Sequence, residues 1–441
     1  MLSRTIALST MIGFATPMLA PAPAKVTHLV VATVDNAQMI ELERLTRYFE
    51  QANPDIRISW VTLDEDTLRS SVSTDISTQG GQYDIATIGT YETPLWAQRG
   101  WLVPIHPDAG YDTADLLPAI RASLSYRNEL YAAPIYGESS MLMYRKDLLH
   151  KAGLSMPARP TWKQVAAFAA RLDDPRHGVY GICLRGKPGW GENMTLVTTM
   201  VNTFGGQWFD MQWKPQLQTP AWRDAVGLYV DLLRHDGPPD AATLGYNQNL
   251  ALFEQGRCAM WVGATVAAGY VTDVNLSKVA SEVGFAQAPV AVTPKGSHWL
   301  WAWALAIPAD TDAAHRAAAR RFIDWATSRA YVKRVASHDG WALAPPGTRA
   351  STYANPAFRA AAPWAGVVLR ALDTADPDDA TLHKAPYAGV QFAVIPSFRA
   401  IGDEVGRYVS EAVAGRLSVD QALARSQHAA ERDMMLAGRR Q

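Results

Sequence analysis

Apolar and polar positions after residue 25 follow an order typical of an α/β protein. Thr27 to Thr33 is rich in Val and Leu, and the apolar positions from Met39 to Phe49 then recur at helical spacing until Asn53-Pro54. A second short apolar run, Ile56 to Thr62, follows at once. This order of strand, helix and strand predicts a βαβ unit and a parallel sheet.

The next two segments continue this pattern and end in a candidate binding loop. A helix is expected from Thr67 to Thr78, and Tyr83 to Ile88 is an apolar strand followed by Thr90, Tyr91 and Glu92. Ligands of open α/β sheets bind beyond the carboxyl ends of strands, so this loop is the first candidate site.

The rest of the chain alternates between further strands and helices, without an internal repeat. Strands are expected at residues 130–135, 141–144, 179–184, 258–262, 283–288 and 299–307. Helices are expected at residues 146–152, 162–172, 193–204, 220–236, 247–255, 312–335, 392–415 and 419–436. Because 441 residues exceed the size at which single hydrophobic cores stop growing, we expect two domains.

The N-terminus has the order of a secretory signal peptide. Arg4 precedes the apolar stretch Thr5 to Leu19, and the small residues Ala20 to Ala24 follow. We therefore predict a cleaved signal peptide over residues 1–24 and a periplasmic mature chain that begins near Lys25. A membrane anchor is disfavoured, because the stretch is shorter than the roughly 20 apolar residues that cross a bilayer.

Net charge and cysteine content narrow the choice of partners. The formal net charge is −1 and the sequence has no basic stripe, so neither nucleic acid nor a membrane surface is expected as a ligand. Cys183 and Cys258 are the only cysteines. An exported chain could join them, but spacing alone does not distinguish one disulfide from two buried thiols.

The motifs of common catalytic sites are missing from the sequence. It contains no G-x-S-x-G, no G-x-x-x-x-G-K-[ST], no G-x-G-x-x-G after a strand and no H-x-x-x-H pair. We therefore expect no enzyme activity, no metal site and no cofactor. A glycosidase needs two carboxylates, which Glu92, Glu138 or Glu192 could supply, so an exported hydrolase acting on glycans is the alternative.

Fifteen tryptophans make a carbohydrate-like ligand plausible, because indoles pack on the C–H faces of sugars and polyols. Trp162, Trp222 and Trp325 lie at helical spacing among apolar residues and are expected in the core. Trp190 lies between two glycines in a loop, where we expect ligand contact.

Two further segments carry candidate ligand contacts. Trp299, Trp301 and Trp303 alternate with smaller residues, so on a strand all three would share one face, and we expect one of the first two to reach a small ligand. Trp341 follows Gly340. Arg349 follows the rigid turn Pro345-Pro346-Gly347, and either a ligand contact or a surface salt bridge would suit it.

Several segments resemble a known family. GESSMLMYRKDLLHKAGLSMPARPTW (137–162) and FEQGRCAMW (253–261) resemble the signature elements of family 1 extracellular solute-binding proteins of ABC importers. The segments 84–96, 181–193, 299–308 and 340–349 are similar to the branch that binds sorbitol and mannitol. One departure is Gly263, where that branch usually carries an Asp, so the resemblance leaves the identity of the polyol open.

The resemblance implies a type II periplasmic-binding-protein fold, in which three crossovers join two α/β lobes around a ligand cleft. The crossovers would fall near residues 135–141, 299–305 and 336–342. The first lobe would comprise residues 25–136 plus 306–337, and the second 137–305 plus 338–441.

The resemblance also implies a function and a set of ligand residues. The chain would capture a polyol or small sugar in the periplasm and deliver it to the transmembrane subunits of an ABC permease. We expect a monomer. A binding protein that signals to a membrane receptor is a further alternative. The implied ligand residues are Asn36, Tyr91, Glu92, Tyr136, Glu138, Trp190, Trp261, Trp299, Trp341, Arg349 and Gln391.

Overall fold

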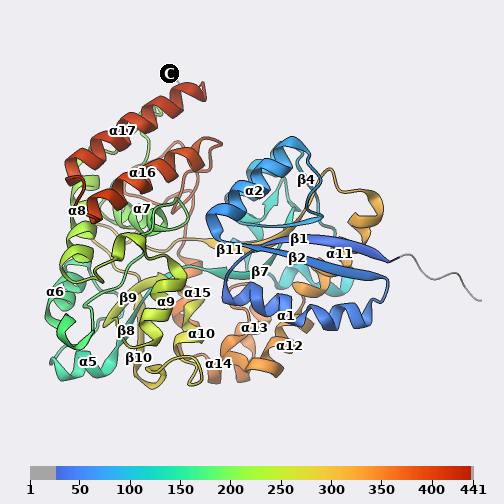
Figure 1. Cartoon of the computed structure of the whole chain (residues 1–441), viewed down its shortest axis with the longest axis horizontal. Coiled ribbons are helices and arrows are strands. Elements are labelled where there is room, and N and C mark those ends of the chain that lie inside the picture. Colours follow the sequence, from blue (N-terminus) through green and yellow to red (C-terminus); the bar gives the residue numbers. More distant parts are fainter. Residues whose placement is uncertain (1–25, 439–441) are drawn as a thin grey trace, which may run out of the picture.

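Two β-sheets organise the chain in the computed structural model, which describes residues 26–438 (Figure 1). Each sheet forms the centre of one lobe, and helices cover both sheets. The predicted signal peptide, residues 1–24, lies outside the described residues. The α/β class and the two-lobed architecture expected from the sequence are confirmed.

The first lobe contains a six-stranded mixed sheet with the order β2-β1-β3-β11-β4, in which β7 also pairs with β11. Strands β1 and β2 and strands β1 and β3 run parallel, whereas β11 is antiparallel to its three neighbours. The strands are β1 (Thr27–Val34), β2 (Ile56–Leu63), β3 (Ile85–Ile88), β4 (Leu102–Val103), β7 (Ala132–Glu138) and β11 (Trp301–Pro308).

Helices α1 and α2 begin directly after the first two strands, as the βαβ pattern predicts. The Asn36 side chain caps α1 by accepting the Met39 N–H, and the Asp64 side chain caps α2 by accepting the Thr67 N–H. Both caps therefore lie at the carboxyl ends of parallel strands. The helices of this lobe are α1 (Ala37–Ala52), α2 (Glu65–Thr78), α3 (Glu92–Gln98), α4 (Pro118–Ser123), α11 (Ala313–Ala326) and α12 (Arg329–Asp339).

The second lobe contains an antiparallel sheet with the order β10-β8-β9. Its strands are β8 (Ser140–Arg145), β9 (Met260–Ala264) and β10 (Val283–Gln287). Helix α15 (Ala365–Asp373) packs on β8 and β10, while α7 (Asn193–Thr203), α8 (Pro220–His235), α16 (Phe398–Val413) and α17 (Val419–Leu436) pack against one another beside it. This helical layer forms one side of the lobe in Figure 1.

Short elements complete the fold. They are the hairpin β5 (Ser125–Tyr126) and β6 (Glu129–Leu130) and the helices α5 (Lys146–Lys151), α6 (Trp162–Leu172), α9 (Tyr246–Glu254), α10 (Ala267–Val271), α13 (Ala350–Ala354) and α14 (Pro356–Ala361).

The chain passes directly from one sheet to the other. Only Ser139 separates β7 in the first sheet from β8 in the second, and residues 288–300 lead back from β10 to β11. Trp299, at the end of the second passage, lines the cavity described below. The exact lobe boundaries expected from the sequence stay a prediction.

Four sequence predictions are corrected by the structure. The loop expected at Glu92 is the start of α3, and residues 179–184 form isolated bridges instead of a strand. The helix expected at 312–335 is two helices, because Ser328 caps a new one by accepting the Tyr331 N–H. The helix expected from Phe392 begins only at Phe398.

The structure also answers the open question about the two cysteines. Cys183 and Cys258 form a disulfide whose Cα atoms lie 5.7 Å apart, and both side chains are fully buried. The bond ties the segment that precedes Trp190 to the start of β9.

Within residues 26–438, no helix combines the length and apolar character that crossing a membrane requires. The same residues contain no cluster of three or more side chains able to hold a metal ion.

Candidate ligand-binding site

A cavity of about 190 Å³ lies between the two lobes. The first lobe contributes the ends of β1 and β2 and the first turns of α2, and strands β7 and β11 form its floor. The second lobe contributes residues around Arg185 and Trp190, the start of α9, and Gln391. The cavity therefore forms where the carboxyl ends of parallel strands meet the other lobe, as expected for an α/β binding site.

Six of the eleven residues expected to bind ligand line this cavity. They are Asn36, Tyr136, Glu138, Trp190, Trp299 and Gln391. Trp301 and Trp303 line it as well, and which of the three tryptophans contacts ligand stays a prediction. The rings of Trp301 and Trp303 stand nearly perpendicular, with centroids 5.3 Å apart, which lets both edges reach the same space.

Three of the six lining residues, Asn36, Tyr136 and Gln391, already use their side chains in hydrogen bonds within the protein. The Asn36 amide donates to the Tyr136 hydroxyl at 3.0 Å. The Gln391 amide both donates to and accepts from the main chain of Leu300, at 2.9 and 3.2 Å. Gln391 therefore holds the segment before β11 in place.

Tyr91 and Glu92 lie next to the cavity but not in its lining. The Tyr91 ring packs against Trp190 with centroids 4.9 Å apart, and its hydroxyl donates to the carbonyl of Ile395 at 2.9 Å. The Glu92 carboxylate accepts hydrogen bonds from Arg69 and from the Gly89 N–H. Both residues thus support lining side chains.

Trp261, Trp341 and Arg349 also lie outside the lining. Trp261 is fully buried behind Tyr246, with ring centroids 5.8 Å apart. Trp341 is partly buried in a turn after α12. Arg349 is fully buried and ion-paired with Asp115 at 3.3 Å.

Arg349 therefore makes a salt bridge, as one of its two interpretations held, but in the core and not on the surface. Its guanidinium also donates to the carbonyls of Tyr111 and Thr327.

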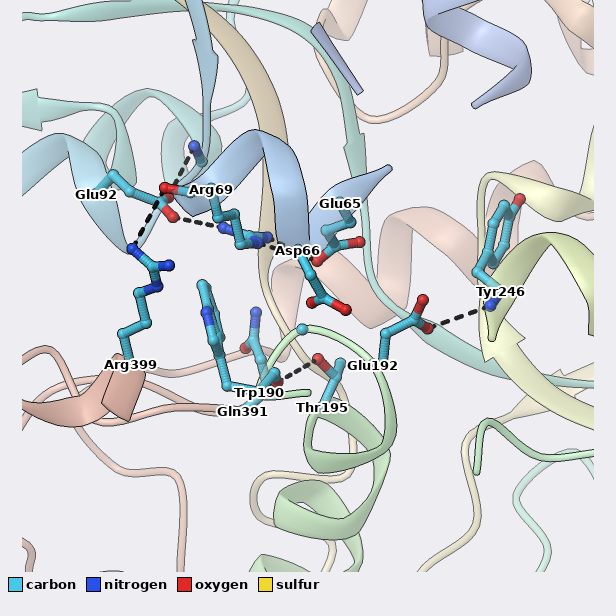
Figure 2. A network of polar contacts seen from close by, with 12 residues as sticks. Glu65, Asp66, Arg69, Glu92, Trp190, Glu192, Thr195, Tyr246, Gln391 and Arg399 are labelled. Atoms are coloured by element: carbon cyan, nitrogen blue, oxygen red, sulfur yellow. Dashed lines mark hydrogen bonds and ion pairs between the residues drawn. The ribbon is translucent and has the colours of Figure 1, made fainter. Parts of the chain in front are cut away.

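Arg69 of α2 is the most highly connected side chain at the site (Figure 2). Its guanidinium bonds to Glu65 at 2.8 Å and to Glu92 on the other side. The guanidinium carbon lies 4.1 Å from the centre of the Trp190 ring and 4.8 Å from those of Trp301 and Trp303. One buried arginine thus joins two carboxylates of its own lobe to an indole of the other.

Two carboxylates, Glu138 and Glu192, face the cavity with only 7% and 6% of their surfaces exposed. Burial raises the pKa of each carboxyl to about 7, and the charge of Arg185 partly opposes the rise. Glu65 lies close enough to both to raise them further. A hydrogen-bond donor on a ligand would favour their ionised forms.

The cavity wall also holds donors without partners. The indole N–H of Trp190 and the Nε–H of Arg185 are buried and make no hydrogen bond within the described chain. An unsatisfied buried donor costs free energy, and a ligand that accepts from it removes the cost.

Sequence reasoning missed four of the residues that shape the site: Arg69, Arg185, Tyr246 and, as a binding residue, Glu192. Arg185 and Glu192 lie within the segment 181–193 that resembles the polyol branch, so its polar residues were available as candidates. Arg69 is one of several polar residues on α2, and no sequence feature distinguishes it.

Comparison with known proteins places this geometry in a family. The profile of the bacterial extracellular solute-binding proteins matches residues 36–333. The chain belongs to this family. Its members bind solutes outside the cytoplasm, which agrees with a ligand cavity between two lobes.

Among individual members of the solute-binding family, a mannitol-binding protein of Pseudomonas aeruginosa is 52% identical over 411 residues, which cover 93% of this chain and 94% of the relative. A solute-binding protein of Agrobacterium vitis, solved with bound D-mannitol, superposes with a TM-score of 0.92 at 51% identity and covers 93% of this chain and 99% of its own. A solute-binding protein of Agrobacterium radiobacter, solved with ribitol, superposes with a TM-score of 0.82 at 25% identity. The match covers 93% of this chain and 100% of that protein.

Proposed function

We propose that this chain is the substrate-binding component of an ABC transporter, which captures a polyol such as mannitol and delivers it unmodified to the permease. The observation that carries the proposal is the 51% identity, over almost the whole chain, to a solute-binding protein with bound D-mannitol. The mannitol-binding relative of similar identity supports it independently.

The chemistry of the cavity agrees with this ligand class. Indole faces of Trp190 and Trp299 would pack on the carbon chain. The carboxylates of Glu138 and Glu192 would accept from hydroxyls, and the free N–H groups of Trp190 and Arg185 would donate to them.

We infer different roles for the eleven residues expected at the site. Trp190, Trp299 and Glu138 would contact ligand directly, whereas Asn36, Tyr136 and Gln391 would shape the wall through their own hydrogen bonds. Behind them lie Tyr91, Glu92 and Trp261, which would hold lining side chains. Trp341 and Arg349 would stabilise the fold.

We further propose that the protein performs no chemistry on its ligand. In a glycosidase, the environments of the two carboxyls move their pKa values apart, so that one is an acid while the other is ionised. Here burial raises the pKa values of Glu138 and Glu192 in the same direction and to a similar value. Glu92, the other candidate acid, is held by Arg69.

The remaining parts of the proposal concern the whole chain. We propose that residues 1–24 are removed on export to the periplasm and that the mature protein works as a monomer. We also propose that residues 25–136 plus 306–337 form one lobe and that residues 137–305 plus 338–441 form the other. The pairing of β8 with β9 and β10 supports the second lobe, whereas the pairing of β7 with β11 keeps residues 301–305 in the sheet of the first lobe.

Thermal unfolding of the mature protein with hexitols, pentitols, aldoses and uronates tests the proposal. A ligand that binds only the folded state, at 100 times its Kd, raises the free energy of unfolding by about 2.7 kcal/mol. We expect a clear rise in Tm with mannitol or a related polyol, and no product after long incubation. Consumption of a glycan without any polyol effect would support the hydrolase alternative instead.

A further inference from the structure

The cavity that we propose as the polyol site carries more carboxylates than cations. Its acidic lining residues are Asp35, Asp64, Glu65, Glu138 and Glu192, and its basic ones are Arg69, Arg185 and Lys187. This excess matters for specificity, because sugar acids share the hydroxyls of polyols and differ from them by one carboxylate.

Two of the three cations are already paired with carboxylates of the protein. Arg69 is held between Glu65 and Glu92. The Lys187 ammonium lies 3.3 Å from Asp66 and 3.5 Å from Glu192. The charge of both cations is therefore already largely neutralised by carboxylates of the protein.

Arg185, the third cation, acts electrostatically on two carboxylates. Its charge opposes the rise in pKa of both Glu138 and Glu192, so it lies within electrostatic reach of both. The guanidinium donates to the carbonyl of Gly191 at 3.0 Å and lies over the Tyr246 ring, which restrict its movement.

The surroundings of the two glutamates contain further acidic groups. The charged and titratable groups that act on Glu138 are Glu65, Arg185, Tyr136 and Tyr246. Those that act on Glu192 are Glu65, Asp66, Arg185, Lys187 and Tyr229. Counted together with Glu138 and Glu192 themselves, the four carboxylates of this group outnumber its two cations, Arg185 and Lys187.

We propose that Glu138 and Glu192 form a charge filter, which admits uncharged polyols to the cavity and excludes the corresponding sugar acids. The inference rests on the proposed function, because it presupposes a polyol in this cavity. A ligand carboxylate would lie among protein carboxylates, and two of the three lining cations, Arg69 and Lys187, already pair with carboxylates of the protein. Repulsion built into a site rejects a competitor as effectively as lost attraction does.

Arg349 was the one sequence candidate that could have received a ligand carboxylate. Its guanidinium is fully buried away from the cavity, and Asp115 neutralises it. Among the described residues, the cavity lining therefore keeps more carboxylates than cations, and two of its cations, Arg69 and Lys187, are already paired.

Two ligands that differ only at one end test the filter: mannitol and mannonate, in which a carboxylate replaces one terminal CH₂OH. We expect calorimetric titration of the mature protein at pH 8 to give at least about 100-fold weaker binding of mannonate, since like charges about 6 Å apart repel strongly at the effective dielectric of a protein interior. Equal affinities would refute the filter alone. Failure of mannitol to bind would refute the proposed function and the filter together.

Variants assign the discrimination to particular side chains. Glu138→Gln and Glu192→Gln each remove one negative charge while keeping the shape of the side chain. We therefore expect the ratio of mannitol affinity to mannonate affinity to fall about 10-fold in each variant. Glu254→Gln is the matched control, because burial also raises the pKa of Glu254 to about 7 although this residue lies outside the cavity lining. A ratio unchanged in both test variants would contradict the proposal.

A pH series on the unaltered protein gives a second measurement that does not depend on folding of a variant. Between pH 8 and pH 6, Glu138 and Glu192 gain protons because their pKa values lie near 7. Mannonate stays charged, since an ordinary carboxyl has a pKa near 4. The ratio of mannitol affinity to mannonate affinity should therefore fall as the pH falls, and a constant ratio would refute the charge filter.

Discussion

Gly263 occupies a place in β9 where a side chain would collide with its neighbour. A Cβ atom at this position would lie 2.6 Å from the Trp261 ring, closer than such atoms approach in proteins. The ring is fully buried against Tyr246 and Phe253, so it has little freedom to move aside. This packing gives a physical reason for a glycine where the polyol branch usually has an Asp.

The variant Gly263→Ala should therefore be destabilised by about 1–3 kcal/mol, the usual cost of overpacking a filled core. We also expect weaker mannitol binding, because a displaced Trp261 would push on Tyr246 in the cavity wall. Chemical denaturation and calorimetry measure the two effects.

Gly227→Ala is the control, since open space surrounds Gly227 within helix α8 and alanine favours helices by about 0.5–1 kcal/mol over glycine. Equal free energies of unfolding for Gly263→Ala and the original protein would show that the Trp261 indole can move aside at little cost in free energy.

Individual residues also show where sequence reasoning succeeds and where it stops. A glycine beside an indole predicted ligand contact at both Trp190 and Trp341. Trp190 lines the cavity, whereas Trp341 lies in a turn outside its lining. Flanking glycines report on the local backbone only. For Arg349, the deciding partner is Asp115, which lies 234 positions earlier in the chain and which no local pattern connects to it.

At the scale of elements, a single segment without regular structure carries several of the cavity's side chains. Residues 179–192 make isolated bridges to β9 and its approach, at Tyr180 and Cys183, and then lead to Arg185, Trp190 and Glu192. The disulfide between Cys183 and Cys258 anchors this segment just before those residues. Its placement makes the bond a support for the binding site as well as for the fold.

Replacing both cysteines by serine should lower the free energy of unfolding by about 2–4 kcal/mol, because the bond closes a long loop between residues 75 positions apart. We also expect weaker ligand binding, since Arg185 and Trp190 would lose their anchor. Unfolding of the double variant and of the oxidised original protein, each with and without mannitol, measures both effects. A double variant with unchanged affinity would show that the segment holds its shape through its hydrogen bonds alone.

Elements were predictable where one local pattern dominates. The first strand, helix and strand follow from apolar spacing and from the breaks at Asn53 and Pro54, and the structure confirms them. The break between α11 and α12 depends on the Ser328 cap, a short-range feature that a continuous helical pattern hides. Residues 179–184 have the composition of a strand, but they find only isolated partners in the folded protein.

At the scale of the whole molecule, contacts across the cavity join the two lobes. Asn247 donates to the carbonyl of Asp35 at 3.0 Å, and Lys187 pairs with Asp66 at the cavity rim. Between these contacts, Arg69 of α2 stacks on the Trp190 ring, and the backbone N–H of Trp190 donates to the carboxylate of Asp403 in α16. In Figure 2 the arginine and the indole lie side by side at the edge of the site.

The stack of Arg69 on Trp190 should therefore retain ligand once the lobes have closed, because Trp190 both lines the cavity and contacts the other lobe. A lysine at this position keeps the positive charge. Its ammonium group is not planar, however, so it cannot hydrogen-bond to both Glu65 and Glu92 as the guanidinium does or lie flat on an indole. We expect Arg69→Lys to release mannitol about 10-fold faster, as the loss of one desolvated cation–π contact would give. Stopped-flow tryptophan fluorescence measures this rate.

Arg44→Lys provides the matched control for that experiment. Arg44 also lies on a helix of the first lobe and also pairs with two carboxylates, those of Glu41 and Asp339, but it is exposed and distant from the cavity lining. If retention depends on the stack, only Arg69→Lys accelerates release, while the association rate changes little. Equal release rates in both variants would instead mean that closure rests on contacts such as Asn247 with Asp35, which neither substitution touches.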